Sequence, residues 1–78
     1  MTIFELHCHN FDLFSENFNY LFSLQRCLEL LFQLGTEKSF VYESFCNDKI
    51  TEDQYKFLNK KLFKLKDAVC ERISNFAK

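Results

Sequence analysis

Residues that interrupt helices are almost absent from this chain. It has 78 residues, no proline and a single glycine, Gly35. Proline removes a backbone donor and clashes with the preceding turn, and glycine weakens a helix through its flexibility. A chain with so few of them can form helices over most of its length, and long loops are not expected. This feature predicts an all-α fold.

The first strongly periodic segment covers residues 11–34. Its polar residues recur at helical spacing in a narrow stripe, and most of the remaining surface is Phe, Leu, Tyr or Cys. An apolar arc this wide needs neighbours on at least two sides, so we expect a central helix. Gly35 comes directly after the last apolar residue, where a left-handed C-cap favours glycine, and it predicts the end of this helix.

A short element is predicted over residues 37–46, with Thr36 as its N-cap. Val41 and Phe45 are four residues apart, as are Tyr42 and Cys46, which favours a short amphipathic helix. The same aromatic and β-branched residues are also good strand formers. Helix is the favoured interpretation, and strand stays open.

A long helix is predicted over residues 52–77. Thr51-Glu52-Asp53-Gln54 has the form of a capping box, in which the first and last side chains bond to each other's free backbone N–H groups. The apolar positions then alternate by three and four, as in a helix that packs lengthwise along another: Tyr55, Leu58, Leu62, Leu65, Val69 and Phe76, with Arg72 interrupting them and Ile73 beside them.

The first ten residues fit two structures. Thr2-Ile3-Phe4-Glu5 also reads as a capping box, which predicts a leading helix. Phe4, Leu6 and Cys8 alternate with polar neighbours, as in an extended arm. The sequence therefore leaves open whether residues 1–10 are a helix or an extended arm. For the whole chain it predicts one helical domain over residues 1–78, a three-helix bundle in the order helix, short helix, long helix.

The apolar content is high for so short a chain. Hydrophobic residues make up 47% and aromatic residues 18%, and a domain this small buries only about 60% of its unfolded surface. Some large side chains are therefore expected to need a partner. We expect a non-catalytic protein-binding module, a small regulator or inhibitor that occludes a site on a larger protein, and homodimerisation as the simplest way to cover the same surface.

The predicted partner-binding residues lie in the last helix. Phe57 and Phe63 fall on the two shoulders of its apolar seam, where one packing neighbour leaves them partly exposed. Lys56, Lys60 and Lys64 lie on the charged face opposite the seam.

Nucleic-acid binding is the first alternative. Residues 56–78 hold seven basic and two acidic side chains, whereas residues 1–55 hold three basic and nine acidic ones. The lysines between Lys56 and Lys66 could neutralise phosphates while neighbouring rings stack on bases. The net charge of −1 argues against it. The same asymmetry favours antiparallel pairing of two copies.

A metal site is the second alternative. On an extended arm, His7 and His9 would project to the same side, and Cys46 or Cys70 could complete a tetrahedron. The cysteines do not form close pairs, so free buried thiols are favoured and neither a metal nor a cofactor is expected.

Enzymatic activity and membrane insertion are not expected. Adjacent Cys and His residues such as Cys8 and His9 point apart in a regular element, and the chain has no glycine-rich phosphate loop. It contains neither a signal-peptide pattern nor eighteen consecutive apolar residues. The expected location is the cytoplasm.

Overall fold

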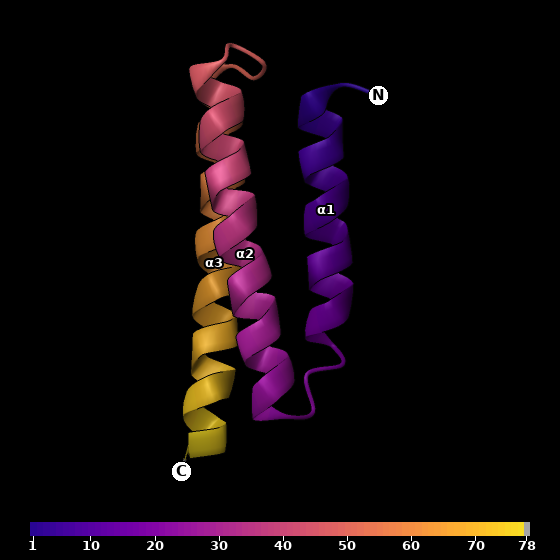
Figure 1. Cartoon of the computed structure of the whole chain (residues 1–78), viewed down its shortest axis with the longest axis vertical. Coiled ribbons are helices and arrows are strands. Elements are labelled where there is room, and N and C mark those ends of the chain that lie inside the picture. The colour runs from indigo at the N-terminus through magenta and orange to yellow at the C-terminus, as the bar shows by residue number, and fades with distance from the viewer. Residues whose placement is uncertain (78) are drawn as a thin grey trace.

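A computed structural model of the chain describes residues 1–77, which form three helices: α1 (Ile3–Phe18), α2 (Leu24–Cys46) and α3 (Glu52–Ala77). In Figure 1 they run down, up and down, so that the N-terminus and the α2–α3 connection lie at one end of the bundle and the C-terminus at the other. The bundle is elongated, with extents of 43 × 19 × 15 Å. The described residues contain no strand, and the all-α three-helix bundle predicted from the sequence is confirmed.

Helix α1 begins at the first capping residue of the chain. The Thr2 hydroxyl accepts a hydrogen bond from Glu5 N at 3.1 Å, which satisfies one of the free backbone donors of the first turn. Residues 1–10, for which the sequence left a leading helix and an extended arm open, therefore lie mostly in α1.

The predicted continuous helix over residues 11–34 is wrong, because the chain breaks between Phe18 and Leu24. Ser23 caps the new helix through a hydrogen bond from Arg26 N, 3.2 Å long. Leu21 is buried within the break, and Arg72 of α3 donates to its carbonyl oxygen at 3.2 Å. Tertiary contacts thus hold a turn that has neither proline nor glycine.

The predicted helix end at Gly35 and the separate short element over 37–46 are also wrong. Helix α2 runs without interruption through both. Gly35 does not have a positive φ, so it is not a left-handed cap. Thr36 is not an N-cap either, since its hydroxyl donates to Phe32 O at 3.3 Å within the helix.

Helix α3 covers the residues predicted for it. The capping box is formed in both directions: Thr51 N donates to Gln54 Oε1 at 2.9 Å, and Gln54 N donates to Thr51 Oγ1 at 3.1 Å. In the preceding turn, Asp48 takes the left-handed conformation, with φ of 58°.

The core lies mainly between α2 and α3. Both helices contribute several fully buried side chains, whereas Phe11 and His7 are the buried residues of α1. The buried apolar residues are Phe11, Leu21, Cys27, Leu30, Leu34, Val41, Ile50, Leu58, Leu62 and Val69. Helix α1 therefore packs on one side of an α2–α3 hairpin.

A candidate protein-binding surface and a buried polar network

Many large apolar side chains remain exposed in the single chain. Phe32 is 77% exposed, and several other aromatic rings are exposed over about half of their surface. The most exposed large residues on the three helices and the α1–α2 connection are Leu13, Tyr20, Phe22, Leu24, Leu28, Phe32, Tyr42, Phe57, Phe63 and Phe76. They are spread over all three helices, so only those that lie close together in space can form a binding patch.

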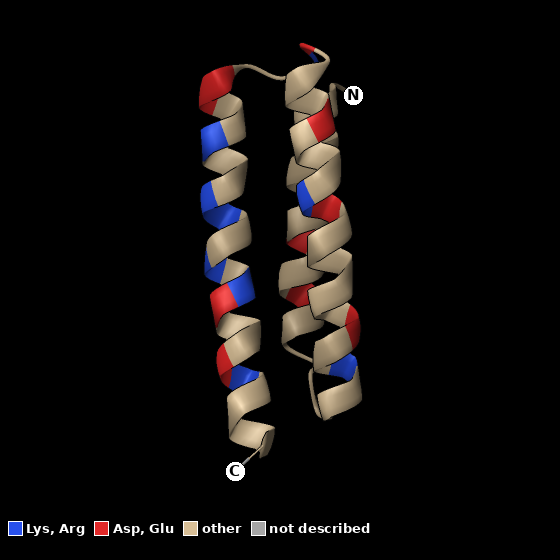
Figure 2. Ribbon diagram, turned by 60° about the vertical axis from the view of Figure 1, so that its left-hand side comes forward, with Lys and Arg blue, Asp and Glu red and all other residues tan. Residues whose placement is uncertain are grey.

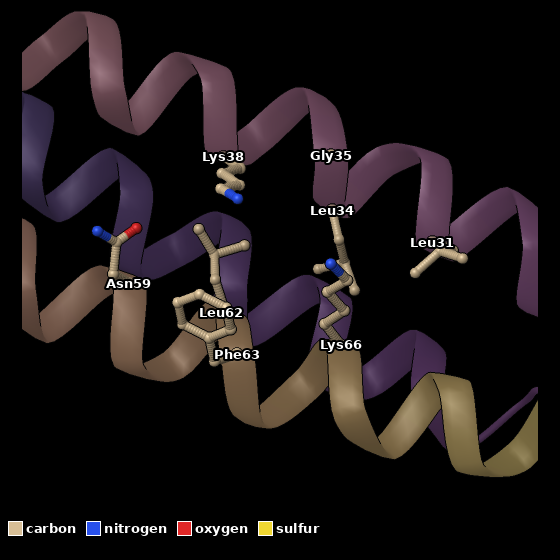
Figure 3. A pocket seen from close by; sticks show the side chains of 8 residues that line it. All are labelled: Leu31, Leu34, Gly35, Lys38, Asn59, Leu62, Phe63 and Lys66. Atoms are coloured by element: carbon tan, nitrogen blue, oxygen red, sulfur yellow. The ribbon is translucent and has the colours of Figure 1, made fainter.

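An apolar groove lies between α2 and α3. It encloses about 300 Å³ and opens on the side of the hairpin away from α1, which lies behind it in Figure 3. Its floor is apolar and lysines stand at its rim. Leu31, Leu34, Gly35 and Lys38 line it from α2, and Asn59, Leu62, Phe63 and Lys66 line it from α3.

The two phenylalanines predicted as binding residues lie on different sides of α3. Phe63 belongs to the groove and is 54% exposed, with Lys38 Nζ 5.7 Å from its ring centre. Phe57 is 46% exposed and faces α1, where its ring centre is 5.9 Å from that of Phe4. Lys61 Nζ lies 4.9 Å from the Phe57 ring centre. The structure does not bring the two rings together into one site.

The three predicted lysines lie in a row along α3. Lys56, Lys60 and Lys64 follow each other at intervals of four residues and are all exposed. Figure 2 shows basic residues along the middle of α3 and acidic ones mostly on the other two helices and at the start of α3. Lys56 Nζ also lies 3.4 Å from Glu52 on the same helix, an exposed pair that contributes little to stability.

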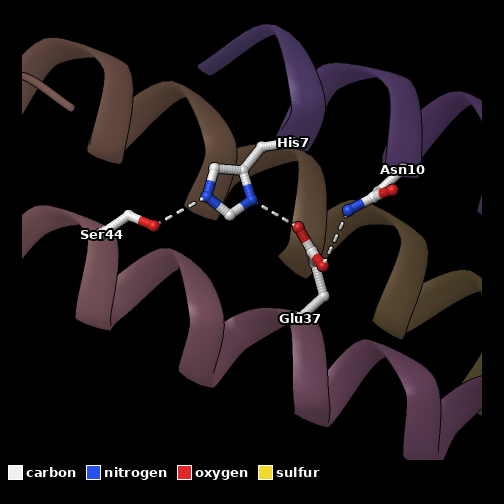
Figure 4. A network of polar contacts seen from close by, with 4 residues as sticks. All are labelled: His7, Asn10, Glu37 and Ser44. Atoms are coloured by element: carbon white, nitrogen blue, oxygen red, sulfur yellow. Dashed lines mark hydrogen bonds and ion pairs between the residues drawn. The ribbon is translucent and has the colours of Figure 1, made fainter. Parts of the chain in front are cut away.

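A buried polar network, which the sequence did not predict, joins α1 to α2 (Figure 4). Nδ1 of His7 lies 2.6 Å from Glu37 Oε1, and its Nε2 lies 3.0 Å from Ser44 Oγ. Asn10 donates to the second Glu37 oxygen at 3.3 Å. The His7 ring also packs against Phe40, with ring centres 4.4 Å apart. No side-chain polar atom buried among the described residues lacks a partner.

The order Ser44, His7, Glu37 resembles a nucleophile, a base and an orienting acid. Its surroundings do not suit catalysis, because His7 is fully buried and Ser44 is only 4% exposed, so a substrate cannot reach the hydroxyl. Ser44 also lies inside α2, where backbone N–H groups are used by the helix and cannot form an oxyanion hole. The network instead satisfies polar groups and fixes the position of α1.

The geometry proposed for a metal site is wrong. His7 and His9 lie in a helix and not on an extended arm, so side chains two residues apart point to different faces. Both ring nitrogens of His7 are already bonded to protein atoms. Among residues 1–77, no group of three or more His, Cys, Asp or Glu side chains is placed to hold a metal ion.

The thiols within the described chain are free. Cys27 is buried, as predicted for the free thiols, but Cys46 and Cys70 are exposed. The pKa of the Tyr42 hydroxyl is raised above its ordinary value, first by a hydrogen bond with Cys46 and then by the charges of Cys46 and Tyr55.

None of the helices described for residues 1–77 combines the length and the apolar character needed to cross a membrane. Comparison with protein-family models, with curated proteins and with solved structures finds no match to this chain.

Proposed function

We propose that this chain is a non-catalytic protein-binding module that seats a helix of a larger protein in the α2–α3 groove. The observation that carries the proposal is an apolar groove with a basic rim, one wall of which is the half-exposed ring of Phe63. Aromatic anchors that enter or line such pockets dominate the energetics of protein interfaces. The module acts as a small regulator or inhibitor, because a bound chain excludes other molecules from the site it covers.

The groove favours an apolar side chain flanked by acidic ones. Leu31, Leu34 and Leu62 offer an apolar floor, and Phe63 forms one wall. Lys38 and Lys66 come from opposite helices, so two carboxylates of a partner helix can each meet an ammonium group at the rim.

The lysine row adds positive potential along α3. Lys56, Lys60 and Lys64 are exposed and do not line the groove, and Lys64 lines a separate pocket with residues of α1. Charges at the edge of an interface mainly raise the association rate and its dependence on salt. Phe57, on the side of α1, is a secondary contact.

The proposal is tested by Phe63→Ala, with Phe76→Ala as a matched control. Both rings are about half exposed on α3, but Phe76 lies near its C-terminal end and does not line the groove. Proteins retained from an extract of the native cell on each immobilised variant are identified by mass spectrometry, and their affinities are then measured.

The partner should bind the wild-type chain and Phe76→Ala alike. It should bind Phe63→Ala at least tenfold more weakly, since loss of a central anchor costs about 2 kcal/mol. If no protein distinguishes Phe63→Ala from the control, the groove is not the binding site.

Nucleic-acid binding is a second candidate, favoured by the exposed lysine row, with which the half-exposed Phe57 and Phe63 are interleaved in the sequence. A labelled single-stranded RNA or DNA should then bind at low salt and dissociate as salt rises. The triple variant Lys56→Glu, Lys60→Glu, Lys64→Glu should lose this binding. Absence of binding by the wild-type chain at low salt removes this candidate.

We also propose a reducing compartment such as the cytoplasm. The cysteines of the described chain are unpaired, and two of them are exposed. Exposed thiols persist where cellular reductants keep them reduced.

A further inference from the structure

Helix α2 exposes an uncharged stripe along its whole length. We call the following residues the α2 stripe: Leu24, Leu28, Phe32, Gly35, Ser39, Tyr42 and Cys46, all of them exposed. They follow each other at steps of three and four residues, which places them on one side of the helix. Residues at this spacing form the line of contact when two helices pack lengthwise. Neither α1 nor α3 covers it.

Gly35 stands at the midpoint of the stripe, eleven residues from Leu24 and eleven from Cys46. Glycine inside a helix is less stable than alanine. The fold of the single chain does not require it, since its φ is not positive and a Cβ at this position meets no atom within 4 Å. An exposed glycine does, however, let a second backbone come close.

The large and small residues of the stripe complement each other about this midpoint. If a second α2 runs antiparallel, with the two Gly35 residues in contact, residue numbers that face each other add to about 70. Phe32 then lies beside Ser39 of the second copy, and Leu24 lies beside Cys46 of the second copy. In both cases a large side chain meets a small one, and Leu28 meets Tyr42.

The polar edge of the stripe fits the same arrangement. Gln25 and Glu43 border it on one side, and in the antiparallel pair the Gln25 amide comes within reach of Glu43 of the second copy. In the single chain, Gln25 has only a long bond of 3.4 Å to Glu29. The antiparallel helix dipoles also attract each other.

We propose that the α2 stripe is a self-association surface, and that its occupant is α2 of a second copy, packed antiparallel across Gly35. Symmetry about the midpoint of the helix is what distinguishes a second copy from another protein, because only a two-fold pair presents the same stripe from both sides. The stripe shares only Gly35 with the α2–α3 groove, so the inference does not depend on the proposed function.

Sedimentation velocity of the full chain between about 1 and 100 µM tests the proposal, a range that brackets micromolar association. The wild-type chain should sediment as a dimer at the upper end. Leu28→Glu should weaken the dimer at least a hundredfold, because each interface would bury two charges. Leu13→Glu is the matched control, since it changes a similarly exposed leucine on α1, and it should leave the dimer intact.

Gly35→Ala should stabilise the monomer but weaken the dimer. In the monomeric Leu28→Glu background it should raise the midpoint of urea unfolding, because alanine favours the helix. In the otherwise wild-type chain it should weaken the dimer at least tenfold, because two added methyl groups separate the backbones.

The orientation is tested at Gln25. In the antiparallel pair Gln25→Lys should tighten the dimer by pairing with Glu43 of the second copy, and Gln25→Glu should loosen it. In a parallel pair residue 25 faces residue 25, and both changes loosen the dimer. A wild-type chain that stays monomeric at 100 µM, or a dimer that Leu28→Glu and Gly35→Ala leave unchanged, overturns the inference whether or not the groove binds a protein.

Discussion

His7 fixes the position of α1 against the rest of the bundle. It is fully buried, yet both of its ring nitrogens are bonded to side chains of α2, Glu37 and Ser44. If Glu37 is ionised, Nδ1 donates to the carboxylate, and a neutral ring then accepts the Ser44 proton at Nε2. Three polar groups thereby leave water without losing their hydrogen bonds, and α1 is fixed in register on α2.

Replacing Glu37 by alanine should lower the free energy of unfolding by about 2–3 kcal/mol, because it removes a buried bond to a charged group and leaves His7 Nδ1 without a partner. Urea denaturation followed by circular dichroism measures this change. Gln33→Ala, at an exposed position of the same helix outside both the groove and the residues of the proposed dimer contact, should change stability by less than about 0.5 kcal/mol. Equal effects of the two variants would mean that the network contributes nothing.

The sequence indicates the position of His7 in this network but not the identity of its partners. Phe4, His7, Phe11, Phe14 and Phe18 recur at steps of three and four, which places His7 on the apolar face of a helix that begins near residue 3. Its partners are 30 and 37 residues away, and no local pattern links them. The partial exposure of Phe57 and Phe63 was predictable, because it follows from their place beside the seam of a single helix.

Among the elements, α3 was predictable because its signals are local. A capping box at Thr51 and a regular seam do not depend on other segments. The break between α1 and α2 is different. It depends on the burial of Leu21 and on a bond from Arg72, 51 residues further along the chain. At Gly35 the error was the reverse: a helix end was predicted where α2 continues, because glycine permits a helix to end but does not require it.

Thr51→Ala should destabilise the protein by about 1 kcal/mol, because it removes the N-cap of α3. Thr36→Ala is a suitable comparison, since Thr36 is exposed inside α2 and alanine is the better helix former. It should be neutral or slightly stabilising. Thermal or urea unfolding of the two variants therefore separates a capping threonine from an ordinary helical one, and equal losses would argue against the cap.

At the scale of the whole molecule, the bundle consists of a well-packed hairpin and a more weakly held first helix. Residues of α2 and α3 make up most of the core, and α1 adds Phe11 and the His7 network. Elements with few buried apolar contacts open before the rest of a structure. The groove and the α2 stripe both lie on the hairpin, so neither surface requires α1 to move.

Hydrogen exchange should show this division. Amides in the middle of α1 should exchange faster than those near Val41 and Leu58, and Glu37→Ala should speed exchange in α1 more than in α3. Mass spectrometry of peptic fragments resolves the three helices. Uniform protection along the chain would instead indicate a single cooperative unit.

Arg72 has a consequence for the order in which the molecule is completed. Its guanidinium donates to Leu21 O and lies 5.1 Å from the Phe18 ring centre. Helix α3 thus supplies a contact that holds the bend between α1 and α2. Helices α1 and α2 both precede Arg72 in the chain, so the bend between them lacks this contact until α3 has packed against both. The angle between the first two helices is therefore set in part by a residue that belongs to neither.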